Sequence, residues 1–129
     1  MTKTIRLTMT QALARFLARQ MTLVDGRKEP IFAGVWAIFG HGNVAGMGEA
    51  LYGVKDELPT YRAHNEQAMA HAAIAFAKAT RRRRMMACTT SIGPGALNMV
   101  TAAAVTMLSA PGPIEVVQAI IRRRRVALA

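Results

Sequence analysis

The feature that most constrains the fold is an uninterrupted apolar run, Ile31–Phe39, which contains no charged side chain. Its length and its β-branched and aromatic residues favour a strand buried on both faces, as in a parallel sheet. A second run, Met85–Thr90, predicts another buried strand. Between them, an alanine-rich stretch predicts a helix from Glu66 to about Thr80, and Asn65 precedes it as a suitable N-cap.

The rest of the chain alternates in the same way. Thr8 and Gln11 match a capping box, which predicts that a helix begins there. The other expected elements are a helix over 10–20, a polar connector with turn chemistry over 25–30, a weak helix over 45–52, a short strand or extended segment over 56–62, and a helix over 96–107. This alternation of helices and strands predicts an α/β fold with a parallel sheet.

Charge and aromatic content bear on the kind of partner. The 129-residue chain has a formal net charge of +10, which would suit an anionic partner. However, eight of its 17 basic residues lie in two blocks, Arg81–Arg84 and Arg122–Arg125. One Trp, two Tyr and four Phe offer little for stacking on bases. A basic module that binds nucleic acid or another anionic surface therefore remains an alternative, but the sequence argues against it, and a solvated turn is the simpler interpretation of Arg81–Arg84.

The sequence also indicates a compartment. The single Cys88 excludes an internal disulfide and fits a reducing cytosol, and the N-terminus lacks the apolar segment of a signal peptide, so we expect a cytoplasmic protein. Residues 85–113 carry no charge and would be long enough to cross a bilayer. Gly93-Pro94-Gly95 would break one continuous helix there, so we expect no membrane span.

Three segments should meet at one edge of the predicted sheet. Ligands of parallel sheets bind beyond the carboxyl ends of the strands. The glycine-rich loops 40–48 and 91–95 each follow a predicted strand, and Glu66 opens the helix after the extended segment. The simplest role for Glu66 is that of a first-turn acid that complements the helix dipole. A binding role becomes attractive if the three segments converge.

One candidate for that edge is a dinucleotide site. Gly40-His41-Gly42-Asn43-Val44-Ala45 fits the G-x-G-x-x-A pattern after a strand. The pattern also requires an acid about 20 residues further on, to hold the ribose. Tyr61, Arg62 and Ala63 occupy that zone, so the sequence argues against this site.

A second candidate comes from resemblance. The segments that carry it are Asn65–Gln67, Ala70–Ala73, Ala75–Thr80 and Ser91–Thr101. Together they resemble, with the same spacing, the E-x-A-A-x-x-A-A-x-G-Y-A-R-x-T and S-G-P-G-x-x-N motifs of the pyrimidine-binding domain of thiamine-diphosphate enzymes. This is the superfamily of acetolactate synthase and pyruvate decarboxylase. The resemblance implies a three-layer α/β/α domain with a parallel sheet, partial here and incomplete at its C-terminus, over residues 1–105.

Within the superfamily the chain most resembles the trihydroxycyclohexane-1,2-dione hydrolases of myo-inositol catabolism. The resemblance implies a thiamine-diphosphate-dependent hydrolase that opens this cyclic diketone between its two keto carbons to give 5-deoxy-glucuronate. The likeness ends near residue 105. Residues 106–129 form a divergent basic tail for which a frameshift or a truncated gene would account.

The resemblance also implies roles for individual residues. Glu66 matches the glutamate that hydrogen-bonds the aminopyrimidine ring and favours its imino tautomer, and we expect its apolar neighbours to keep its proton shareable near neutral pH. His41 matches a loop against cofactor and substrate and is a candidate proton donor or acceptor, although a loop histidine bonded to backbone is an equal alternative. The other expected cofactor-binding residues are Gly40, Gly42, Asn43, Thr89, Thr90, Ile92, Gly93 and Asn98.

Relatives hold the diphosphate and Mg²⁺ in a C-terminal domain that carries a Gly-Asp-Gly motif, and this chain has no such motif. The resemblance implies that a second subunit carries that domain, that the full-length form is a homo-oligomer, and that this chain contributes no metal ligand. We therefore expect an N-terminal fragment that is inactive alone. A remnant that only pairs with full-length subunits is a further alternative.

Overall fold

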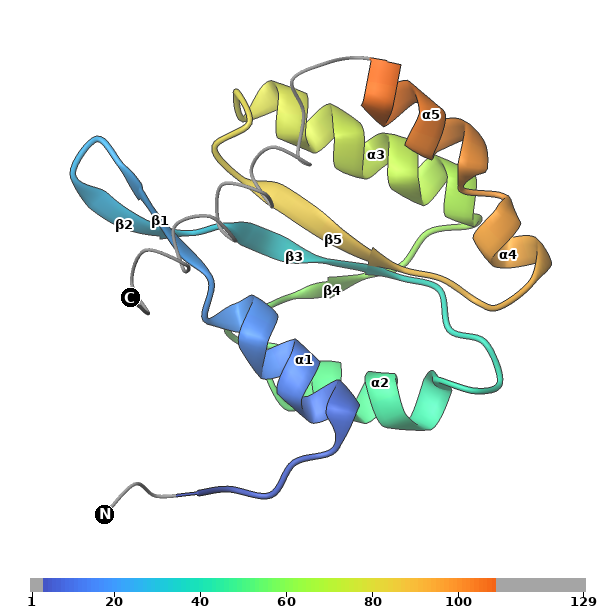
Figure 1. The fold of residues 1–129 in the computed structure, drawn as a ribbon, viewed down its shortest axis with the longest axis horizontal. Helices are drawn as coiled ribbons and strands as arrows, with labels where there is room; N and C mark the ends of the chain where they lie inside the picture. The colour runs from blue at the N-terminus through green and yellow to red at the C-terminus, as the bar shows by residue number, and fades with distance from the viewer. Residues whose placement is uncertain (1–3, 109–129) are drawn as a thin grey trace, which may run out of the picture.

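The computed structural model describes residues 4–108, and Figure 1 shows their arrangement. The elements in chain order are α1 (Met9–Ala18), β1 (Met21–Val24), β2 (Arg27–Pro30), β3 (Phe32–Ala37), α2 (Val44–Tyr52), β4 (Thr60–Tyr61), α3 (Glu66–Ala79), β5 (Met85–Thr89), α4 (Pro94–Leu97) and α5 (Val100–Leu108). Strands β4, β3 and β5 form a three-stranded sheet in that order, and β1 and β2 form a separate hairpin.

All pairings in the three-stranded sheet are parallel. Val35 and Trp36 of β3 pair with Thr60 and Tyr61 of β4. On the other side, β3 pairs with β5, with Ala37 opposite Thr89. Because the strands are parallel, their carboxyl ends lie on one edge of the sheet. The predicted parallel α/β sheet is therefore confirmed.

Helices cover both faces of this sheet, so the predicted three-layer arrangement is also confirmed. Figure 1 shows α1 and α2 on one face, and α3 and α5 on the other. The α1/α2 side holds the main core cluster, which consists of Ala14, Val35, Ala37, Ala50, Leu51 and Leu58. On the α3 side, Met69, Ala70 and Ala77 are buried. The small alanines of α3 let the helix approach the sheet closely.

The two predicted helix starts are present. Thr8 Oγ1 accepts a hydrogen bond from the Gln11 backbone N–H at 3.2 Å, and Gln11 Oε1 accepts one from the Thr8 N–H at 3.0 Å, which completes the capping box. Asn65 Oδ1 accepts a hydrogen bond from the Ala68 N–H at 2.7 Å. Each cap satisfies a backbone donor that the first helical turn leaves free.

Two local predictions need correction. The connector 25–30 is not only a turn, because β2 lies within it and pairs with β1. Asp25 and Gly26 have φ values of 49° and 80°, as a two-residue type I′ hairpin turn requires. The helix predicted over 96–107 is two helices, and it begins earlier, at Pro94, whose fixed φ suits a first turn. At the break, the Met99 N–H bonds the Ala96 carbonyl, a tighter 3₁₀-type contact.

Within the described part of the chain, no helix combines the length and the apolar character needed to cross a membrane. The expected boundary at residue 105 falls within α5, and the expected basic tail over 106–129 lies almost entirely outside the described residues, so this division of the chain stays a prediction.

Candidate functional site

The candidate site is centred on Glu66, the first residue of α3. Although it is an acid, its side chain is buried, with only 8% of its surface exposed. Its Oε1 accepts a hydrogen bond from Ser91 Oγ at 2.7 Å. Ser91 follows β5, and Glu66 follows β4 after a short connection, so the two residues meet at the carboxyl edge of the sheet.

Gly95 packs directly against this pair. A Cβ atom built on Gly95 would collide with Ser91 Oγ and Glu66 Oε1, and would lie 3.0 Å from Glu66 Cδ. Only a residue without a side chain fits there. Both residues lie in the loop 91–95 that was expected at this edge, but neither was named as a binding residue, and the contact of Ser91 and Gly95 with Glu66 was not predicted.

Hydrogen bonds dominate the electrostatics of this carboxyl group. The Ser91 hydroxyl, followed by the backbone N–H of Glu66 itself, lowers the pKa of Glu66 below its ordinary value. Burial opposes this effect, and the Asn98 side chain adds a smaller lowering contribution. The expectation that apolar neighbours keep the proton shareable near neutral pH is therefore wrong for the ligand-free chain, because donors to the carboxylate outweigh its desolvation.

The loop after β3 reaches the same edge. The Gly40 N–H donates to Asn43 Oδ1 at 2.9 Å, and Asn43 Nδ2 donates to the Thr90 carbonyl at 3.4 Å. A Cβ on Gly40 would lie 3.2 Å from Ser91 Cα, so the two loops are in direct contact. The expected convergence of the two glycine loops and Glu66 is therefore confirmed.

The other expected residues lie around this junction. Thr89 ends β5, and its carbonyl accepts a hydrogen bond from the Ile38 N–H at 3.0 Å. His41, Gly42, Ile92 and Gly93 are all exposed. A Cβ on Gly42 or Gly93 would meet no atom within 4 Å, and Gly93 has a φ of 62°, in the left-handed region that favours glycine. The structure thus places these residues on the solvent-exposed side of the two loops, and their binding roles stay predictions.

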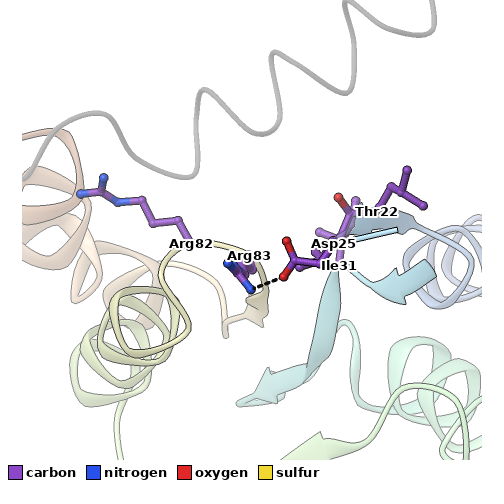
Figure 2. A pocket seen from close by; sticks show the side chains of 7 residues that line it. Thr22, Asp25, Ile31, Arg82 and Arg83 are labelled. Atoms are coloured by element: carbon purple, nitrogen blue, oxygen red, sulfur yellow. Dashed lines mark hydrogen bonds and ion pairs between the residues drawn. The ribbon is translucent and has the colours of Figure 1, made fainter. Parts of the chain in front are cut away.

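A cavity of about 370 Å³ lies elsewhere, between the β1–β2 hairpin and the turn formed by Arg81–Arg84, here called the arginine turn (Figure 2). Arg83 Nη1 and Asp25 Oδ2 form an ion pair across it at 3.2 Å. Ile31 precedes β3 and Arg83 precedes β5, so the cavity lies at the amino ends of the strands, opposite Glu66. Both partners of the ion pair are largely exposed, which limits its contribution to about 1 kcal/mol or less. The arginine turn is therefore separate from the candidate site.

The family described as "Thiamine pyrophosphate enzyme, N-terminal TPP binding domain" matches residues 33–111, more than half of the chain. The chain belongs to this thiamine pyrophosphate enzyme family. The matched region contains every site segment described above: the β3 loop, the start of α3, and the loop after β5.

Curated relatives show which members of the family the chain is similar to. The chain is 54% identical over 101 residues to a 3D-(3,5/4)-trihydroxycyclohexane-1,2-dione hydrolase from Listeria monocytogenes serotype 4b, a match that covers 78% of this chain and 16% of that protein. A protein of the same name from Bacillus thuringiensis is 50% identical over 102 residues, covering 79% of this chain and 16% of the relative. The match thus spans about a sixth of the length of these relatives. No solved structure matches the chain.

Proposed function

We propose that Glu66 and the two glycine loops hold the aminopyrimidine ring of thiamine diphosphate in a hydrolase that opens a trihydroxycyclohexane-1,2-dione at a carbon–carbon bond. The observation that carries the proposal is the buried Glu66 carboxylate at the meeting point of both loops. The names of relatives that are 50–54% identical support the substrate and reaction class.

The residues at the junction suit a flat, nitrogen-bearing ring. A carboxylate that faces such a ring can hydrogen-bond a ring nitrogen and exchange a proton with it. The glycines at positions 42 and 93 leave their Cβ directions open, so a ring can approach the backbone there. The hydrogen bond from Asn43 to the Thr90 carbonyl connects the two loops.

When bound, thiamine diphosphate supplies a reactive carbanion at its thiazolium ring, and the protein supplies orientation and electrostatics. The task of Glu66 is to favour the imino tautomer of the aminopyrimidine through a hydrogen bond to the ring. For this, the ring must replace part of the hydrogen bonding that holds the carboxylate ionised in the free chain. In this proposal His41, an exposed residue of the loop after β3, exchanges a proton with the substrate.

The proposal includes a second subunit. In it, a second subunit binds the diphosphate and Mg²⁺, and the assembled form is a homo-oligomer. Within residues 4–108, no cluster of three or more His, Cys, Asp or Glu side chains is arranged to hold a metal ion. The isolated chain is therefore expected to bind the pyrimidine part of the cofactor weakly and to lack turnover.

Calorimetric titration of the purified chain with thiamine tests the pyrimidine site, because thiamine has the ring without the diphosphate. We expect saturable binding that Glu66→Gln weakens roughly 10- to 100-fold, the usual effect of losing a hydrogen bond to a charged group. Glu49→Gln, on the exposed surface of α2, is the matched control and should bind as the wild type does. Equal binding by wild type and Glu66→Gln would refute the site.

A turnover assay with thiamine diphosphate, Mg²⁺ and the cyclic diketone tests the incomplete-site part of the proposal. We expect no 5-deoxy-glucuronate from the chain alone. Clear turnover by the isolated chain would show that no second subunit is required.

A further inference from the structure

We propose that Ser91 is the positioning residue for Glu66: its hydroxyl fixes the direction in which the carboxyl group meets a bound ring, in both protonation states of that group. The inference rests on the proposed function for its purpose, but its structural part concerns residues of this chain alone. Neither the family match nor the names of the relatives assign a role to Ser91.

The first observation is the geometry of the contact. Ser91 Oγ lies 2.7 Å from Glu66 Oε1, a short distance typical of a hydroxyl that donates to a carboxylate. The residues are 25 positions apart in the sequence, so this bond connects the loop after β5 to the start of α3.

The second observation is that glycines pack against the pair. A Cβ atom at position 95 would occupy the space of Ser91 Oγ and Glu66 Oε1. A Cβ atom on Gly40, in the loop after β3, would lie 3.2 Å from Ser91 Cα and Cβ. Ser91 is therefore packed against Gly95 of its own loop and Gly40 of the neighbouring loop, which restricts the positions open to its side chain.

The third observation is the absence of a competing cation. The two ion pairs of the described residues join Arg19 to Glu57 and Arg83 to Asp25, and neither includes Glu66. The titratable side chains on the neighbouring segments are His41, Arg62, His64, His71 and Cys88, and within residues 4–108 none of them contributes to the lowering of the Glu66 pKa. Neutral donors therefore hold the carboxylate, with Ser91 as the largest contributor.

A serine hydroxyl suits this position because it can both donate and accept. It donates to Oε1 while Glu66 is ionised. When Glu66 holds a proton that it shares with a ring nitrogen, the hydroxyl can rotate and remain in contact with the carboxyl group. A lysine or arginine in its place would oppose protonation of Glu66 and so hinder the proton exchange that the proposed function requires.

The test is a carboxyl ¹³C NMR titration of the full 129-residue chain, with the Glu66 resonance assigned from Glu66→Gln. In wild type, the Glu66 pKa should lie below the ordinary value of a glutamate. Ser91→Ala should raise the Glu66 pKa toward the ordinary value, and Ser91→Thr, which keeps the hydroxyl, should restore the wild-type behaviour. Thr22→Ala, on the hairpin at the opposite end of the sheet, removes a hydroxyl as a matched control and should leave Glu66 unchanged.

Thiamine titration of the same variants gives the second readout. Ser91→Ala should weaken binding roughly tenfold while Ser91→Thr binds within about twofold of wild type, as expected for one hydrogen bond that orients the carboxyl group. Circular dichroism establishes that each variant is folded. If Ser91→Ala is not folded, the comparison of Ser91→Thr with wild type still tests the role of the hydroxyl.

The outcomes separate the two proposals. A Glu66 pKa that is the same in wild type and Ser91→Ala overturns the positioning role, whatever thiamine does. Absence of thiamine binding to the wild type, with a pKa that still depends on Ser91, overturns the proposed function and leaves the structural role of Ser91 supported.

Discussion

Replacing Gly95 by alanine should damage the site and the stability of the protein together. Gly95 lies in α4, where the conformational preference alone would make alanine the better residue by about 0.5–1 kcal/mol. The new methyl group, however, would overlap Ser91 Oγ and Glu66 Oε1 and lie 3.0 Å from Glu66 Cδ. Forcing an extra methyl group into such a space typically costs about 1–3 kcal/mol.

The two terms give the expected size of the effect. Subtracting the preference for alanine from the steric cost leaves a net destabilisation of roughly 0–2.5 kcal/mol for Gly95→Ala. Gly48→Ala is the matched control, because Gly48 is also helical but its Cβ would meet only Phe39 Cζ, at 4.0 Å, which is ordinary contact. We expect Gly48→Ala to stabilise the protein by about 0.5–1 kcal/mol.

Urea denaturation monitored by circular dichroism measures both variants, and an unchanged slope shows that the comparison reports stability. The same samples give the Glu66 carboxyl resonance, which should shift in Gly95→Ala and stay fixed in Gly48→Ala. If Gly95→Ala is as stable as wild type and its Glu66 resonance does not move, the packing argument for the site is wrong.

Three further predictions concern the core, acid stability and the thiol. Leu58→Ala should lower the free energy of unfolding by about 2–5 kcal/mol, because Leu58 is fully buried in the main cluster, and urea denaturation measures this. The pKa of Glu66 is lowered in the folded protein, so the ionised carboxylate stabilises the fold above its unfolded pKa, and this contribution disappears as the pH falls through its folded pKa. The free energy of unfolding of Glu66→Gln should therefore decrease less than that of wild type between pH 5 and acid unfolding. Equal decreases would contradict this. Burial raises the pKa of the Cys88 thiol to about 11, so Cys88 should react with a thiol reagent at pH 8 much more slowly than free cysteine, and only unfolding should bring its rate to that of the free amino acid.

Patterns over a few residues predicted much of the fold. The apolar run Ile31–Phe39 became the central strand β3, and Thr8 and Asn65 cap the helices as their side-chain chemistry predicts. These features depend on short-range rules of period, capping and burial. The hairpin was missed because β2 consists of Arg27-Lys28-Glu29-Pro30, which has no alternation of apolar residues to mark it as a strand.

The site was predicted in outline. The sequence indicated that Glu66 and the glycine loops meet beyond the carboxyl ends of the strands, and the structure brings them together. It indicated the loop 91–95 but not the hydrogen bond from the Ser91 hydroxyl to Glu66, and it suggested the wrong direction for the pKa of Glu66. The apolar neighbours of Glu66 along α3 are visible in the sequence, whereas the donors that lower its pKa come from another element.

The sequence by itself thus determined the central strand β3, the capped starts of α1 and α3, the place of Glu66 in its helix, and the family to which the chain belongs. Only the tertiary structure decided the strand order β4-β3-β5, and with it the contact between a carboxylate and a hydroxyl that are 25 residues apart. The physical reason is the range over which each kind of interaction acts. Caps and hydrophobic periods act within a turn or two of the chain, but the state of a buried charge depends on every donor that the packed sheet brings within hydrogen-bonding distance.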